Sequence, residues 1–160
     1  MADRKRSIRA PLLDRLVDES PGGLPERPPM RVLKRNVFAK SVVRDLVWLL
    51  NTRAATRIMP DGELRAHTKT VLDYGVEDFS HLVAGSYDDR QRLAKSIRNA
   101  IEVYEPRLKV HRITVEPVEG RHLSAAIRCE AWLVADEVRE PVSFNMQLNT
   151  SEGKVELDGR

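Results

Sequence analysis

The sequence is poor in cysteine, in aromatic residues and in long apolar runs, and these scarcities narrow the classes of protein to which it can belong. Its one cysteine, Cys129, cannot form an internal disulfide or a cysteine-based zinc site, which agrees with a reducing compartment. No apolar run approaches the roughly eighteen residues of a membrane-spanning helix. A proline and acidic residues interrupt the N-terminal stretch where a signal peptide would need apolar residues. We therefore expect a cytoplasmic protein with no direct membrane insertion.

Recognisable catalytic patterns are also missing. The sequence has no glycine-rich phosphate loop and no GxSxG motif. Glu102 and Glu105 are three residues apart, and a pair of carboxylates can serve a glycosidase. However, Arg107 would keep its neighbour Glu105 ionised, and glutamates at this spacing are commonly a solvated helix face. The four histidines never occur at the short spacings of metal sites: His67, His81, His111 and His122. We predict a protein that is not an enzyme and needs no cofactor or metal.

The composition is that of one soluble domain. The chain has 160 residues, of which 41% are apolar and 32% are charged. Residues 1–60 contain 13 Lys and Arg against 6 Asp and Glu, a net +7, whereas residues 61–160 contain 14 against 18, a net −4. A basic front can serve nucleic acid or an acidic protein surface, or it can simply be solvated. Because no interleaved aromatics or helix-turn-helix pattern accompany it, we expect no nucleic-acid partner.

Residues 1–35 have the pattern of an N-terminal arm. Leu12, Leu13 and Leu16 recur at helical spacing, which predicts a short amphipathic helix over residues 11–18. A proline- and glycine-rich linker follows it. Isolated helices below about 12–15 residues are marginal in water, so this one is expected to fold onto something else. The three leucines are therefore candidate binding residues.

The body, residues 36–160, is predicted to contain three helices. The first covers residues 41–51, with Ser41 as its cap, a broad apolar face, and Arg44 and Asp45 on the opposite side. A second, short helix is expected from about Glu63 to Asp73 and ends at Gly75. The third begins after Ser86 or Asp88, repeats apolar residues at steps of three and four, and is ended by Pro106.

After the third helix the apolar period changes to two, which predicts strands. A change of parity near His111-Arg112 indicates a bulge, and Glu119-Gly120 indicates a turn. Odd-numbered apolar residues over 123–133 and even-numbered ones over 142–148 each predict a strand with one buried face, and a short strand closes the chain around 155–157. We therefore predict an α+β fold with three helices packed on an antiparallel β-meander of about four strands, preceded by the N-terminal arm.

Glu105, Pro106 and Arg107 lie at the corner between the third helix and the first strand. Proline lacks the amide hydrogen that a helix interior needs, and it drives the residue before it toward extended geometry. Because Tyr104 and Leu108 flank the charges, the site should be partly buried and its charges matched. Two interpretations stay open, a structural ion pair that fixes the corner and an anchor for a binding surface. Glu105, Pro106, Arg107 and Leu108 are therefore candidate binding residues.

Four ordered motifs resemble the TssE family of type VI secretion baseplate subunits, which is related to the phage tail baseplate wedge protein once called a lysozyme. The resemblance covers nearly the whole chain, except that the region from Ala55 to Thr70 departs from the family's pattern. The motifs are residues 12–16 (LLDRL), 41–46 (SVVRDL) with 49–53 (LLNTR), 71–75 (VLDYG) with Asp78 and Ser80, and 104–108 (YEPRL).

The resemblance implies a structural wedge component whose residues 36–160 form a sheath-like handshake domain. Its partners would be the wedge proteins TssF, TssG and TssK and the sheath proteins TssB and TssC, in a cytoplasmic baseplate docked at the inner membrane. In the family, Glu105, Pro106 and Arg107 correspond to a motif that supports strand exchange between neighbouring sheath-type domains. Two other functions stay open, a phage-type baseplate protein with residual muramidase activity and a nucleic-acid binder that uses its basic arm.

Overall fold

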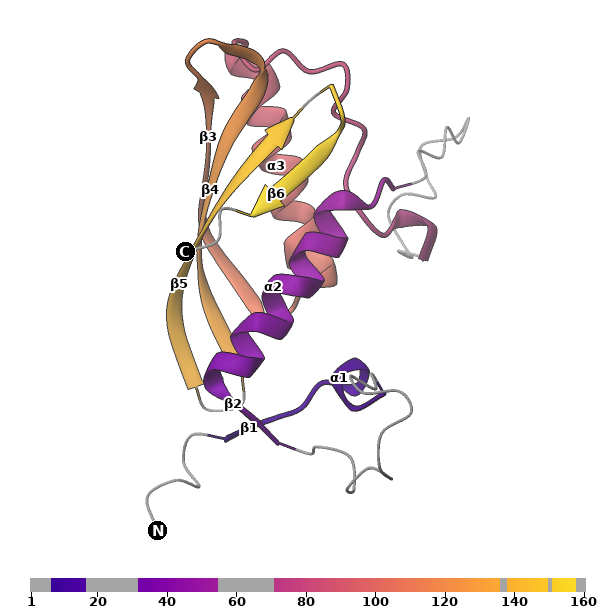
Figure 1. Ribbon diagram of the computed structural model, residues 1–160, viewed down its shortest axis with the longest axis vertical. Helices are drawn as coiled ribbons and strands as arrows, with labels where there is room; N and C mark the ends of the chain where they lie inside the picture. The colour runs from indigo at the N-terminus through magenta and orange to yellow at the C-terminus, as the bar shows by residue number, and fades with distance from the viewer. Residues whose placement is uncertain (1–6, 17–31, 55–70, 136–137, 150, 158–160) are drawn as a thin grey trace.

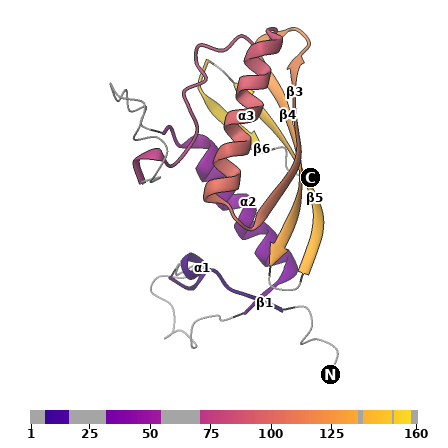
Figure 2. The same ribbon diagram turned by 180° about the vertical axis from the view of Figure 1, so that it is seen from behind.

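The computed structural model describes residues 7–16, 32–54, 71–135, 138–149 and 151–157. Its elements are β1 (Ser7–Arg9), α1 (Leu12–Leu16), β2 (Val32–Lys34), α2 (Arg35–Asn51), the 3₁₀ turn η3 (Val71–Asp73), α3 (Tyr87–Tyr104), β3 (Leu108–Val118), β4 (Arg121–Ala135), β5 (Val138–Asn149) and β6 (Lys154–Leu157). Strands β3 to β6 form one sheet with α2 and α3 on the same face (Figure 1). Seen from behind, a smaller unit of β1, α1 and β2 lies beside the first turns of α2 (Figure 2). The predicted α+β class is confirmed.

The main sheet is an antiparallel meander in the order β3-β4-β5-β6, as the alternation of apolar residues predicts. The register of β3 against β4 shifts between Val110 and Arg112, which confirms the bulge expected near His111-Arg112. The turn at Glu119-Gly120 is present as well. There Gly120 has a φ of 71°, a left-handed conformation that glycine adopts at little cost.

The core lies between the inner face of the sheet and the two long helices. Odd-numbered residues of β4 from Ala125 to Leu133 and even-numbered residues of β5 from Val142 to Leu148 pack into it, so the predicted parity of both strands is confirmed over these residues. Cys129 is fully buried, and burial raises the pKa of its thiol to about 11, as suits a core residue. The best buried members are Val42, Leu46, Leu50, Ile97, Ile101, Leu108, Ala125, Ile127, Cys129, Met146 and Leu148.

Helix α2 begins at Arg35, six residues before the predicted start. Ser41 is therefore not a helix cap but a residue of the helix interior, only 6% exposed. The physical reason is that Phe38, one turn before Val42, also faces the core and extends the buried stripe toward the N-terminus. The true cap position, Lys34, makes no side-chain capping hydrogen bond, so the sequence carries no local start signal there.

The other two predicted helices have different outcomes. Most of the second, residues 63–70, lies outside the described residues, as does the rest of the Ala55 to Thr70 region, and its last three residues form the single 3₁₀ turn η3. The third is confirmed as α3. Of its two candidate caps, Ser86 takes the role, and its Oγ accepts a hydrogen bond from the backbone nitrogen of Asp89 at 3.3 Å.

Leu46 gives a direct test of this core, because it has no exposed surface. Replacing it with alanine removes buried methyl groups and leaves a cavity, so Leu46→Ala should lower the free energy of unfolding by about 2–5 kcal/mol in a urea titration. Val37→Ala is the matched control on the same helix, since Val37 is 42% exposed, and it should change stability little. Equal losses in both variants would contradict the packing described.

Candidate functional site

The corner between α3 and β3 is built around a buried ion pair. Glu105 ends the helix, and its backbone N–H donates to the carbonyl of Ile101 at 2.8 Å. Glu105 is only 3% exposed. Arg107 donates from Nε and Nη2 to the two carboxylate oxygens of Glu105, so both oxygens are engaged by one guanidinium. The carbonyl of Glu105 also accepts from the N–H of Leu108 at 3.0 Å, which starts the strand. The structural ion pair interpretation is confirmed.

A second carboxylate holds the same guanidinium from α2. Nη2 of Arg107 donates to Oδ2 of Asp45 at 2.6 Å, and the Arg107 Cζ lies 5.8 Å from the centre of the Phe38 ring. Burial acts to lower the pKa of Arg107, but the hydrogen bonds to Glu105 and Asp45 outweigh it and raise the pKa above its ordinary value. The guanidinium therefore stays charged and joins the corner to α2.

The pairing continues from Asp45 to the arm. Oδ1 of Asp45 accepts from Nε and Nη2 of Arg44 at 3.0 and 2.8 Å, and the same Nη2 lies 2.9 Å from Oδ1 of Asp14 in α1. Ser41 completes the contact by donating to Oδ2 of Asp14 at 2.6 Å. We call the five alternating charges Asp14, Arg44, Asp45, Arg107 and Glu105 the ionic chain.

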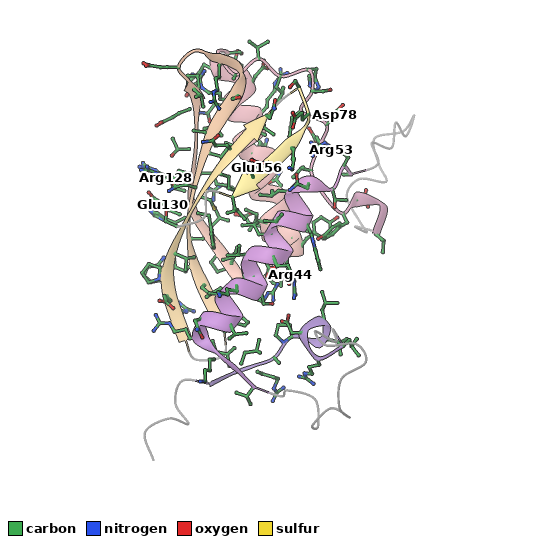
Figure 3. All side chains as sticks on the ribbon, in the orientation of Figure 1. Arg44, Arg53, Asp78, Arg128, Glu130 and Glu156 are labelled. Atoms are coloured by element: carbon green, nitrogen blue, oxygen red, sulfur yellow. The ribbon has the colours of Figure 1, made fainter. Side chains whose placement is uncertain are left out.

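Sequence reasoning placed Arg44 and Asp45 on the side of the helix away from the core and missed their role. Their side chains are 33% and 19% exposed, and both face charged partners (Figure 3 labels Arg44). Asp14 was not singled out either. The only sequence signal for this role was the pair of adjacent opposite charges in the SVVRDL motif. The partners themselves are distant, since Arg107 lies 62 positions after Asp45 and Arg44 lies 30 positions after Asp14.

The arm leucines do not pack against the described part of the body. Leu12, Leu13 and Leu16 are 70%, 43% and 71% exposed, and α1 contains no buried residue. The arm is instead attached through the buried residues Ile8 and Ala10, the ladder between β1 and β2, and Asp14. The three leucines, which we call the leucine surface, are thus available to a partner, while the predicted linker lies outside the described residues.

Two more of the family-like motifs meet at the end of α2. Asn51 donates from Nδ2 to the carbonyl of Val155 and accepts from its N–H, both at 2.9 Å, and so holds β6. Gly75 does not end a described α-helix but lets residue Val76 bond to Thr52. Its φ is 116°, and a Cβ there would lie 2.3 Å from the Thr52 carbonyl oxygen. These motifs have a structural role in holding the end of α2.

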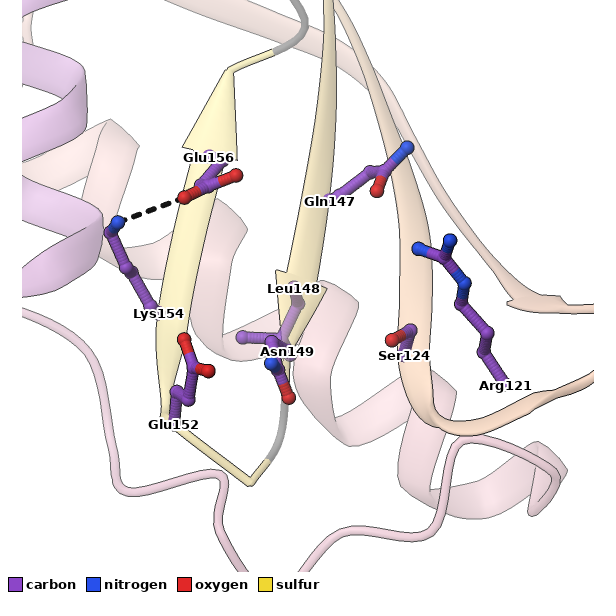
Figure 4. A pocket seen from close by; sticks show the side chains of 8 residues that line it. All are labelled: Arg121, Ser124, Gln147, Leu148, Asn149, Glu152, Lys154 and Glu156. Atoms are coloured by element: carbon purple, nitrogen blue, oxygen red, sulfur yellow. Dashed lines mark hydrogen bonds and ion pairs between the residues drawn. The ribbon is translucent and has the colours of Figure 1, made fainter.

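The remaining surface features offer little chemistry. A polar hollow at the end of the sheet contains Lys154 and Glu156, which pair with each other at 2.8 Å (Figure 4). Glu102 lies 3.5 Å from Arg98, and both oxygens of Glu105 are bound by Arg107, so neither carboxylate is placed like a glycosidase acid. Within the described ranges no group of three potential metal ligands occurs, and no helix is long and apolar enough to cross a membrane.

Comparison with known proteins identifies the family to which the chain belongs. The family model described as baseplate wedge protein gp25 matches residues 37–138, more than half of the chain. The chain therefore belongs to the gp25 baseplate wedge family, a family of structural baseplate proteins, and the predicted resemblance to it is confirmed. A chain from a solved structure entitled "The baseplate complex from the type VI secretion system" is 17% identical, with a TM-score of 0.41, and the match covers 68% of this chain and 94% of that one. No curated protein matches.

Arg107 is the residue whose loss should destabilise the protein most among the charged side chains. Arg107→Ala leaves the buried carboxylate of Glu105 without a partner, and breaking a buried pair in this way costs about 3–5 kcal/mol of unfolding free energy. Arg112→Ala on β3, the strand that follows the corner, is the control, because Arg112 is exposed. The double variant Glu105→Gln with Arg107→Met should be more stable than Arg107→Ala, and the reverse order in thermal melts would contradict the pairing.

Proposed function

We propose that this protein is the TssE-type subunit of a type VI secretion baseplate and joins its wedge to the contractile sheath. Family membership supports the wedge role. The observation that carries the connection to the sheath is the contrast between the two long edges of the main sheet, one protected and one open, together with the rigid corner that supports the open one.

The β3 edge is protected against further strands. The bulge at His111 interrupts its regular spacing, and Arg98 of α3 donates to the edge carbonyls of Val110 and His111 at 3.4 and 3.3 Å. Each edge strand also contains one proline, Pro117 in β3 and Pro141 in β5, so proline does not distinguish the two edges. Bulges and charged side chains are among the usual means by which proteins block strand addition. We therefore exclude this edge as the site for the sheath.

The β5 edge differs over its first two thirds. β6 pairs only with residues 146–149 of β5, so residues 138–145 have no strand partner on the side away from β4 among the described residues. An exposed stretch of this kind accepts an added strand through backbone hydrogen bonds. We assign this stretch of β5, which we call the open edge, to a strand supplied by the sheath proteins TssB and TssC.

The corner controls the register of the open edge. The carbonyl of Arg107 accepts from the N–H of Val134 at 2.8 Å, and Val134 is the register partner of Arg139 at the start of β5. The ion pairs of Arg107 therefore fix β4 and, through it, the first residues of the open edge. This supports Glu105, Pro106, Arg107 and Leu108 as residues that act in sheath attachment by holding the strands and not by chemistry of their own.

The leucine surface is assigned to the wedge side. Leu12, Leu13 and Leu16 are exposed on one short helix, and exposed apolar residues grouped in this way commonly mark a protein interface. We propose that they contact TssF, TssG or TssK in a cytoplasmic baseplate docked at the inner membrane. Residues 36–160 then act as the sheath-like handshake domain, and residues 1–35 act as an arm toward the wedge.

Hydrogen exchange tests the open edge. When TssB and TssC are added, the amides of residues 138–145 that face away from β4 should exchange about tenfold more slowly, the equivalent of one hydrogen bond of roughly 1.4 kcal/mol. The amides on the outer side of β3 are the internal control and should be unchanged. New protection on β3 with none on β5 would overturn the assignment of the edge.

Co-purification tests the leucine surface. Leu12→Ser combined with Leu16→Ser should abolish co-purification with TssF and TssG while leaving the melting temperature unchanged, because both side chains are already in solvent. Val71→Ser is the matched control, since Val71 is 90% exposed but lies outside the arm. Retention of both wedge proteins by the double variant would reject this surface, and hydrolysis of cell wall by the purified chain would instead support the muramidase alternative.

A further inference from the structure

The ionic chain connects the two surfaces assigned above. At one end Asp14 belongs to α1, which carries the leucine surface. At the other end Arg107 and Glu105 belong to the corner, and the carbonyl of Arg107 accepts from β4 beside the open edge. Every intervening contact between charges is 2.9 Å or shorter. Each residue between the two ends contacts an opposite charge on either side. The ionic chain is therefore continuous from Asp14 to Glu105.

The members of the chain share their hydrogen-bonding atoms. Nη2 of Arg44 serves both Oδ1 of Asp14 and Oδ1 of Asp45, at 2.9 and 2.8 Å. Asp45 in turn divides its two oxygens between Arg44 and Arg107. When Asp14 withdraws, Asp45 becomes the sole carboxylate partner of Arg44 in the ionic chain and is drawn toward it. The hydrogen bond between Asp45 and Arg107 must then change in length or direction, because hydrogen bonds that share a charged group influence each other.

The arm is held against α2 by a small number of contacts. α1 has five residues and buries none of them, so it is not stable as a helix without its contacts to α2. Next to α1, β1 is joined by three residue pairs to β2, which leads directly into α2, and Ile8 and Ala10 are buried. Such a small attachment can be strengthened or weakened by whatever binds the leucine surface.

We propose that Asp14, Arg44 and Asp45 are positioning residues for Arg107, so that docking of the arm on α2 sets the geometry of the corner. This inference rests on the proposed function. It predicts that a partner which holds α1 in place also strengthens strand binding at the open edge, and by linkage that the reverse is true. None of these residues needs to touch the added strand.

Asp14→Asn is the variant that tests the proposal, because it keeps the shape of the side chain and removes its charge. In the full chain, it should shift the Nε–Hε NMR resonance of Arg107 and speed exchange of that proton with water. Ser41→Ala, which removes the other hold on Asp14, should shift the resonance in the same direction by less. Arg15→Gln is the control on the same helix, since Arg15 bonds only to the carbonyl of Ala10 among its described contacts. An unmoved Arg107 resonance in Asp14→Asn would overturn the proposal.

Binding of TssB and TssC provides a second measurement, which distinguishes failure of the positioning role from failure of the proposed function. Asp14→Asn should weaken binding of TssB and TssC by about fivefold or more in the natural background and should have no effect in an Arg44→Met background, where the connection is already broken. Equal losses in both backgrounds would overturn the positioning role. If TssB and TssC fail to bind the unmodified chain, the proposed function fails, while the NMR result still decides whether the arm positions Arg107.

Discussion

A guanidinium shared by carboxylates from two separate elements is the interaction on which the rest of this structure depends. Arg107 lies where α3 gives way to β3, and it holds Glu105 of its own corner and Asp45 of α2. Because Glu105 is only 3% exposed, its charge would be costly without this partner. One side chain therefore fixes the end of a helix, the start of a strand and the position of a second helix.

Much of the fold could be predicted because its signals are local. A strand with one buried face shows its parity in the sequence, and β4 and β5 obey that parity. The cap of α3 at Ser86, the turn at Gly120 and the bulge near His111 each depend on a few neighbouring residues. The pairing of Glu105 with Arg107 belongs to the same class, since the two residues are two positions apart.

What could not be predicted depends on contacts between distant segments. The start of α2 has no local cap, and the helix is extended because Phe38 packs into the core. Asp45 lies on the polar side of an amphipathic pattern, and only the fold brings it to Arg107. Asp14 likewise gains its partners when the arm reaches α2, so periodicity gave no reason to select it.

The unequal edges of the main sheet give the molecule a direction. A sheet that could accept strands at both edges could occupy any position in a row of domains joined edge to edge. It would also tend to form such rows with copies of itself. Here the bulge at His111 and the guanidinium of Arg98 block one side, while residues 138–145 lack a strand partner among the described residues. Under the proposed function, strands would therefore be added on one side only, and the subunit would stand at the end of a row and not inside it.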